Sequence, residues 1–117
     1  EATARGDLGA VALDWSARAS VGVVLASHGY PGPYETGRPI DGLSRLEAGT
    51  FAFHAGTGAG PSGYETAGGR VLTIVALGDT MAEARERAYR NVERVHFEGM
   101  TFRPDVARRE LEAPVLP

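Results

Sequence analysis

The chain has 117 residues, a net charge of −3, 43% hydrophobic residues and no cysteine, and its 12 cationic side chains are all arginine. This composition is typical of one soluble domain; it argues against a nucleic-acid partner, whose binding proteins are usually basic, and it excludes disulfides, thiolate metal sites and lysine nucleophiles. No apolar run approaches the roughly 20 residues of a membrane-spanning helix and no signal-peptide pattern is visible, so we expect a cytoplasmic protein without a membrane partner.

The first predicted element is a helical turn over residues 1–5. Gly6 would stop it, because glycine takes the left-handed conformation after a helix most easily. A chain that begins in the last turn of a helix indicates preceding residues, so we expect residues 1–14 to be the end of an upstream helix and a linker. Trp15 is expected to anchor either the core or a domain interface.

Two apolar runs predict the central strands. Residues 21–26 are a continuous valine-rich run, which predicts a fully buried strand, and residues 70–77 predict a second strong strand. Three weaker segments complete the sheet: a strand over 50–54 with Phe51 and Phe53 on one face, a hairpin turn over 56–63 with a returning strand over 64–66, and an edge strand over 100–102.

Residues 28–42 are predicted to be a long loop rich in glycine, proline and tyrosine. Its prolines remove backbone donors, so it cannot be a central strand, and a loop of this length in a small domain is more often functional than not. We expect Ile40 and Leu43 to attach its far end to the core. Two interpretations remain open for its tyrosines: they cover a ligand or another domain, or they pack on the core.

A capping box of Thr80 and Glu83 predicts the start of the main helix, at about residues 80–97. Its apolar stripe is formed by Met81, Ala84, Ala88, Val92 and Val95. Four arginines, Arg85, Arg87, Arg90 and Arg94, are expected to form a solvated face with the pairs Glu83–Arg87 and Glu86–Arg90. Residues 107–117 predict a frayed tail. The whole predicts an α+β fold, a small, mostly antiparallel sheet with one main helix on a face.

Gly68, Gly69 and Arg70 are the strongest candidates for a binding site. The two glycines let a backbone approach a ligand closely, and the guanidinium fork of Arg70 matches a phosphate or carboxylate. The alternative is a glycine bulge that enters a strand, with Arg70 on the surface.

His54 and Tyr30 are candidates of second rank. His54 ends a strand, but no nucleophile accompanies it, so no catalytic residue is predicted. The spacing of His28, His54 and His96 matches no known ligand pattern, so no metal site is predicted either. Arg103 and Asp105 are expected to form a local ion pair.

Six motifs in order carry a resemblance to a known family: Gly-Tyr-Pro-Gly-x-Tyr at 29–34, His-Ala-Gly-Thr at 54–57, Gly-Gly-Arg-Val-Leu at 68–72, Ala-Leu-Gly-Asp-Thr at 76–80, Ala-Tyr at 88–89 and Arg-x-Asp at 103–105. From about residue 8 to residue 109, the chain resembles the C-terminal domain of phosphoribosylamine–glycine ligases, also called glycinamide ribonucleotide synthetases.

The resemblance implies an ATP-grasp ligase of purine biosynthesis. In that family ATP and Mg²⁺ activate the glycine carboxylate as an acyl phosphate, and the amine of 5-phosphoribosylamine attacks it to give glycinamide ribonucleotide, ADP and phosphate. The resemblance places residues 15–109 in a small, β-rich, barrel-sandwich-like C-terminal domain and leaves residues 110–117 as a tail. The family's ATP and Mg²⁺ machinery lies upstream, so this domain alone would bind neither.

By the same resemblance, Arg70, Gly69, Gly68, His54 and Tyr30 would lie on the phosphoribosylamine side of the active site. The domain would complete the substrate pocket with the upstream ATP-grasp domains of the same polypeptide and would be inactive alone. Thr36 and Ala107 depart from the family's usual basic residue and glycine. Two other interpretations stay open, a stand-alone module that binds sugar phosphates and a purely structural brace domain.

Overall fold

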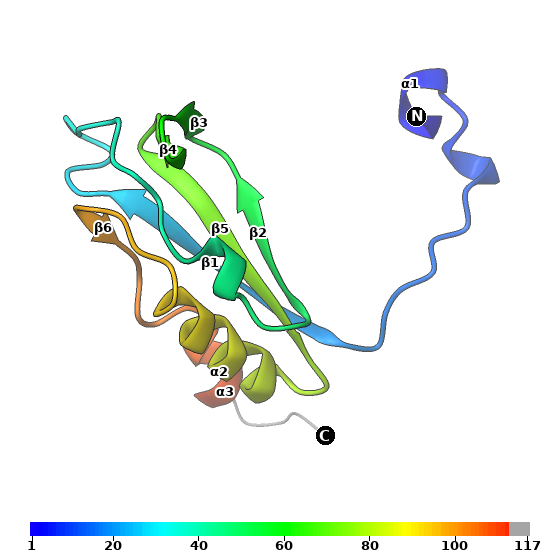
Figure 1. The fold of residues 1–117 in the computed structure, drawn as a ribbon. Coiled ribbons are helices and arrows are strands. Elements are labelled where there is room, and N and C mark those ends of the chain that lie inside the picture. Colours follow the sequence, from blue (N-terminus) through cyan, green and yellow to red (C-terminus); the bar gives the residue numbers. More distant parts are fainter. Residues whose placement is uncertain (113–117) are drawn as a thin grey trace.

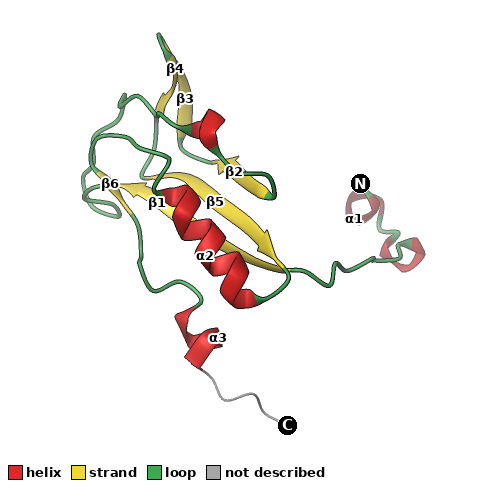
Figure 2. Cartoon of the chain, turned by 60° about the horizontal axis from the view of Figure 1, so that its bottom comes forward, coloured by secondary structure: helices red, strands yellow, loops and turns green. Residues whose placement is uncertain are grey.

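The computed structural model describes residues 1–112, which form two β-sheets and a main helix (Figure 1). The helix α2 lies against one face of the larger sheet (Figure 2). In chain order the elements are α1 (Ala2–Arg5), the 3₁₀ turn η1 (Leu8–Ala10), β1 (Ala19–Ser27), the 3₁₀ turn η2 (Leu43–Arg45), β2 (Thr50–His54), β3 (Thr57–Gly60), β4 (Gly63–Thr66), β5 (Arg70–Gly78), α2 (Met81–Val92), β6 (Met100–Thr101) and α3 (Arg108–Glu112).

The larger sheet is open and has the strand order β2-β5-β1-β6, with antiparallel pairing throughout. β3 and β4 form a separate antiparallel hairpin. The predicted α+β class with a mostly antiparallel sheet is therefore confirmed, as is the edge position of the strand at residues 100–101.

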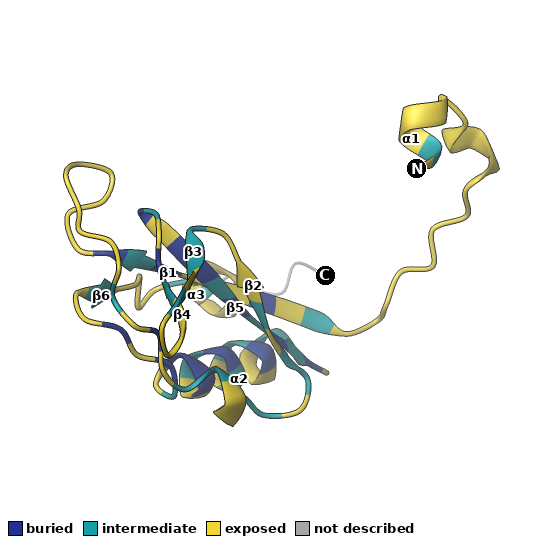
Figure 3. Ribbon diagram, turned by 45° about the horizontal axis from the view of Figure 1, so that its top comes forward, coloured by how far each residue is buried: buried dark blue, intermediate teal, exposed yellow. Residues whose placement is uncertain are grey.

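The two central strands are buried on one face only. Along β1 the side chains of Val21, Val23 and Leu25 are buried, while the residues between them are exposed (Figure 3). The prediction of a fully buried strand over residues 21–26 is therefore wrong. The reason is that a single helix layer covers one face of the sheet and leaves the other open.

A β-bulge interrupts the pairing of β1 with β5. Leu25 pairs with Leu72 and Ala26 pairs with Arg70, so Val71 has no partner on β1. In a β-bulge, two residues of one strand lie opposite one residue of its partner, and the bulged strand bends locally. Accordingly, the adjacent side chains of Val71 and Leu72 are both fully buried.

The N-terminus of α2 is capped as predicted. The hydroxyl oxygen of Thr80 accepts a hydrogen bond from the backbone N–H of Glu83 at 3.2 Å. The Glu83 carboxylate accepts from the N–H of Asp79 at 3.0 Å, one residue earlier than in a standard capping box.

α2 ends at Val92, so the predicted extension to about residue 97 is wrong. Residues 94 and 95 form tight turns, and His96 then exchanges two backbone hydrogen bonds with Asp41 in the long loop. This pairing draws the backbone out of the helix. Val95 and Phe97 remain fully buried, because this segment returns over the core.

The N-terminal residues lie apart from the sheet (Figures 1 and 3). α1 ends at Arg5 and is followed by Gly6 in the left-handed conformation, as predicted. We call residues 1–17 the N-terminal arm. Trp15 is 83% exposed, so it does not anchor the core of this domain. At the other end, residues 108–112 form the short helix α3, where a frayed tail was predicted, and residues 113–117 of that tail lie outside the described residues.

Candidate functional site

Three of the predicted site residues meet at one end of the larger sheet. Tyr30, Gly69 and Arg70 line a depression of about 470 Å³, together with Val24, Ala55, Leu72 and Thr73. Arg70 is the only charged residue among them. The depression therefore presents one positive charge on otherwise uncharged walls, which suits an anionic ligand.

The guanidinium of Arg70 is exposed and makes no hydrogen bond or ion pair with any residue in the range 1–112. Most other arginines are bound to partners within the domain: Arg5, Arg18, Arg38, Arg45, Arg85, Arg87, Arg90, Arg94, Arg103 and Arg108 all donate to carboxylates or backbone carbonyls. Arg70 thus keeps its donors available to a ligand, in a fork geometry that fits two phosphate oxygens.

The turn that precedes Arg70 is held from two sides. The backbone N–H of Ser27 donates to the carbonyl of Gly69 at 2.8 Å, and the Ser27 hydroxyl donates to the carbonyl of Gly68 at 3.2 Å. From the other side, the N–H of Gly56 donates to the carbonyl of Arg70 at 2.9 Å. Ser27 is buried and marks the end of β1; sequence reasoning missed its role because its partners are about 40 residues away.

The glycines of this turn make room for protein groups. A Cβ atom placed on Gly69 would lie 2.1 Å from Cδ2 of Tyr30, and one placed on Gly56 would lie 2.7 Å from Cα of Gly68. The space beside Gly69 is therefore filled by the tyrosine ring, so the expected close approach of a ligand to this glycine does not apply there. The carbonyl groups of the turn are used internally, and the side chain of Arg70 is what faces the depression.

His54 does not line the depression. Its Nδ1 lies 2.9 Å from Oγ1 of Thr57, and its ring packs against Tyr64 with the centroids 4.5 Å apart. These contacts bind His54 to the β3–β4 hairpin. Only its neighbour, Ala55, lines the depression.

The long loop forms a second depression, of about 450 Å³, lined by His28, Tyr34, Glu35, Arg38 and Glu98 among others. Arg38 pairs with Glu35 and lies 2.9 Å from Glu98. The hydrogen bond to Glu35, followed by the charge of Glu98, raises the pKa of Arg38. Because two carboxylates neutralise this arginine, the second depression is not suited to a phosphate.

The predicted anchors of the long loop are confirmed, since Ile40 is buried and Leu43 packs against the core. Tyr30 and Tyr34 are both partly exposed, with their ring centroids 6.2 Å apart, so neither tyrosine is a core residue.

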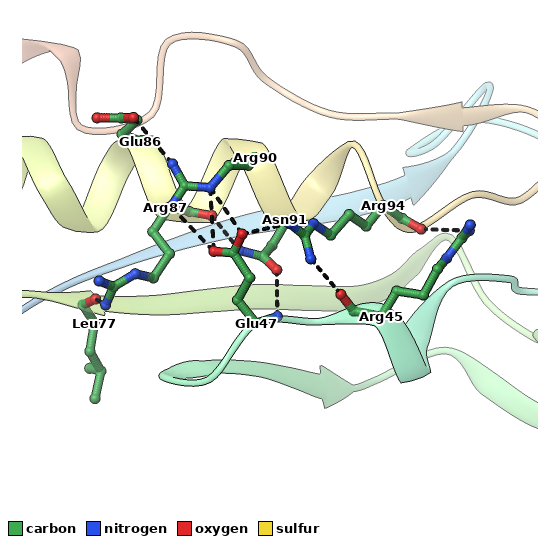
Figure 4. A network of polar contacts seen from close by, with 8 residues as sticks. All are labelled: Arg45, Glu47, Leu77, Glu86, Arg87, Arg90, Asn91 and Arg94. Carbon is green, nitrogen blue, oxygen red and sulfur yellow. Dashed lines mark hydrogen bonds and ion pairs between the residues drawn. The ribbon is translucent and has the colours of Figure 1, made fainter.

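The arginines expected to form a solvated helix face are instead bound to partners within the domain, and Arg94 lies just beyond the end of α2. The carboxylate of Glu47 accepts from Arg90 at 3.1 Å, from Arg94 at 2.6 Å and from the buried Asn91 at 3.2 Å (Figure 4). Its side chain is 26% exposed. Hydrogen bonding from Arg90, together with that from Asn91, lowers the pKa of Glu47. These contacts fasten the segment before β2 to α2, across more than 40 residues of sequence.

The remaining helix arginines also bind backbone groups. Arg85 donates to the carbonyls of Val106 and Pro104, and Arg87 donates to the carbonyl of Leu77 instead of pairing with Glu83. The pair Glu86–Arg90 is present at 3.1 Å, as is the predicted ion pair between Arg103 and Asp105 at 2.7 Å.

Within residues 1–112, no group of three or more histidine, aspartate and glutamate side chains is arranged to hold a metal ion. In the same range, the helices are too short or too polar for any of them to traverse a lipid bilayer.

The comparisons with known proteins agree on one family. A family model described as "Phosphoribosylglycinamide synthetase, C domain" matches residues 20–109. The phosphoribosylamine–glycine ligase of Caldanaerobacter subterraneus subsp. tengcongensis is 47% identical over 107 residues, which cover 92% of this chain and 25% of that protein. The chloroplastic phosphoribosylamine–glycine ligase of Arabidopsis thaliana is 46% identical, over 94% of this chain and 21% of that protein.

A solved structure, the phosphoribosylamine–glycine ligase of Thermotoga maritima, superposes with a TM-score of 0.65 at 43% sequence identity, over 74% of this chain and 21% of that one. The chain therefore spans about a quarter of the length of the curated relatives that it matches.

Proposed function

The chain belongs to the phosphoribosylglycinamide synthetase C-domain family, and we propose that it serves as the C-terminal domain of a phosphoribosylamine–glycine ligase. In this proposal the intact enzyme joins glycine to 5-phosphoribosylamine with the conversion of ATP to ADP and phosphate. The present domain contributes a wall of the phosphoribosylamine site and has no activity alone.

The observation that carries the proposal is the state of Arg70. Its guanidinium is exposed, has no partner among residues 1–112, and is the only charge of an otherwise uncharged depression. We assign it to the 5-phosphate of phosphoribosylamine, which it can bind through two N–H groups at once. Tyr30 lies beside it and offers an apolar ring to the sugar.

The proposed role is to bind and orient the substrate. Among the described residues, no carboxylate or histidine lines the depression, so we assign no proton transfer to this domain. The described residues also do not fit a Mg²⁺ site, which needs carboxylate oxygens in a cluster. We therefore place ATP and Mg²⁺ in the rest of the ligase and derive no step through them here.

Steady-state kinetics of the intact ligase with the substitution Arg70→Ala test the proposal. Loss of a hydrogen bond to a charged group costs about 1.5–3 kcal/mol, so KM for 5-phosphoribosylamine should rise about tenfold or more. KM for ATP should stay nearly constant. Arg70→Lys should recover part of the loss, because lysine keeps the charge without the fork.

Arg108→Ala is a matched control, since Arg108 is an exposed arginine of α3 that pairs with Glu112. It should leave both KM values unchanged. If Arg70→Ala also changes neither KM, the phosphate role is wrong and the domain acts as a structural brace. Sub-millimolar binding of ribose 5-phosphate by the 117-residue chain alone would instead support a stand-alone sugar-phosphate-binding module.

A further inference from the structure

The larger sheet has one face that nothing in the described chain covers. The outward residues of its three longest strands include Val24 on β1, Phe51 and Phe53 on β2, and Thr73 and Val75 on β5, which we call the open face. Phe51 is 48% exposed, Phe53 58% and Val24 41%, and the two phenylalanine rings lie 6.3 Å apart. A contiguous exposed apolar surface on one side of a sheet is typical of an interaction site.

None of the five residues that define the open face is charged. Gly22 lies among these positions, and a Cβ atom placed on it would be 3.3 Å from Cγ2 of Thr73, so the centre of the face is flat and closely packed. On the opposite side of the sheet α2 buries its apolar stripe. A second layer on the open face would give the sheet the two-sided cover that buried sheets have in larger enzymes.

The open face is continuous with the candidate phosphate site. Val24 and Thr73 belong to the open face and also line the depression that holds Arg70 and Tyr30. Any layer that covers the face therefore approaches the exposed guanidinium. Such a layer would form the wall that the depression lacks.

The N-terminal arm indicates where this layer comes from. It leads directly into β1, and within it Val11, Leu13 and Trp15 alternate with smaller or polar residues in an extended segment. All three are exposed. The domain thus has unpaired apolar surface both on the sheet and on the chain that enters it, while it spans only about a quarter of the length of its relatives. A partner on the same polypeptide has a high effective concentration and prevails over a second copy of the domain.

We propose that the rest of the ligase polypeptide packs on the open face and on the apolar side of the N-terminal arm, and that this packing closes the depression at Arg70. The inference rests on the proposed function, because it requires the domain to be part of a longer ligase. The open face would then be the surface through which the domain contacts the rest of the enzyme. The same packing would supply the missing wall of the depression at Arg70.

Hydroxyl-radical footprinting of the intact ligase tests the proposal without any substitution, because it reports the exposure of each aromatic side chain. Phe102 is the matched control: it is the same residue type, is 39% exposed, and contacts Tyr89 on the helix side of the sheet. In the described domain Phe51 and Phe53 are more exposed than Phe102. In the intact ligase we expect the order to reverse, with both oxidised at least about threefold more slowly than Phe102, and with Trp15 protected as well.

Oxidation of Phe51 and Phe53 at the rate of Phe102 or faster would overturn the proposal. Protection that disappears on dilution would also overturn it, because the cover would then be a second copy. The result is independent of Arg70→Ala: protected phenylalanines with an unchanged KM would keep the interface and reject the phosphate role, and exposed phenylalanines with a raised KM would do the reverse.

Discussion

The ring of Tyr30 lies directly on the backbone of Gly69, so that a methyl group at residue 69 would come within 2.1 Å of the Cδ2 atom of the ring. This contact joins the long loop to the turn that presents Arg70. It explains why two sequence-predicted site residues from distant motifs lie together.

We therefore expect Gly69→Ala to destabilise the domain by about 1–3 kcal/mol, the usual cost of overpacking, because Tyr30 must move. Denaturant unfolding of the 117-residue chain measures the change. Gly9→Ala is the control, since a Cβ atom placed on Gly9 would meet no residue beyond its chain neighbours and its own helical turn within 4 Å, and it should be nearly neutral. In a Tyr30→Ala background the cost of Gly69→Ala should become small; an equal cost in both backgrounds would show that the ring is not the obstacle.

Ala107 is the one described non-glycine residue with a positive φ, at 60°. The left-handed conformation costs an L-residue roughly 1–2 kcal/mol, which glycine avoids. Ala107→Gly should therefore raise the stability of the chain by about 0.5–1 kcal/mol after the added flexibility of the unfolded chain is subtracted. Ala82→Gly, on the exposed side of α2, is the control and should lower it by about 1 kcal/mol. A lower melting temperature for Ala107→Gly would contradict the prediction.

Glu47 should make stability depend on pH in the acid range. Its pKa is lowered in the folded state from the ordinary value of 4.5, mainly by the hydrogen bond from Arg90. The stabilisation is therefore complete above pH 4.5 and is lost as the pH falls through the lower, folded-state pKa. Glu47→Gln should lower the melting temperature at neutral pH. This difference in melting temperature from the wild type should shrink as the pH falls from 4.5 through the folded-state pKa of Glu47.

Glu86→Gln is the control for this series. Glu86 also pairs with Arg90, but its side chain lies largely in solvent, so its pair contributes little. A difference between wild type and Glu47→Gln that stays constant from neutral to strongly acid pH would contradict the ion-pair explanation.

The cap of α2 predicts a further change in stability. Thr80→Ala removes the acceptor for the N–H of Glu83 and should cost about 1 kcal/mol, measured by thermal unfolding. Thr80→Ser keeps an acceptor at the same position and should restore most of the loss. Equal effects of the two substitutions would mean that the methyl group of Thr80, and not its hydroxyl, is what matters.

The elements that depend on nearby residues could be predicted from the sequence. The central strands β1 and β5 follow apolar runs. The start of the helix follows the pair of Thr80 and Glu83, which interact within one turn. The helix end could not be predicted, because Asp41 fixes it from a segment more than 50 residues earlier. The same reason explains the helix arginines: Arg90 and Arg94 look solvated until Glu47 is placed beside them.

The sequence singled out several residues that the structure brings together, and their role as a binding site stays a prediction. Arg70, Gly69 and Tyr30 do lie around one depression, and the sequence motifs pointed to each of them. The hydrogen bonds from Ser27 to the turn before Arg70 could not be predicted, because the partners are about 40 residues apart in the sequence. Nor does the position of His54 at the end of a strand indicate that its side chain binds the β3–β4 hairpin.

The bulge at Val71 decides on which side of the sheet Arg70 lies. Leu72 faces α2, and strict alternation along β5 would direct residue 70 to the same side. With Val71 inserted, Arg70 pairs with Ala26 and opens instead toward the side of Val24 and Thr73. Deletion of Val71 would remove the bulge and leave Arg70 beside Leu72, so by strict alternation the arginine would stay on the side of Val24 and Thr73. The bulge therefore lets β5 bury one additional valine without turning Arg70 beneath the helix.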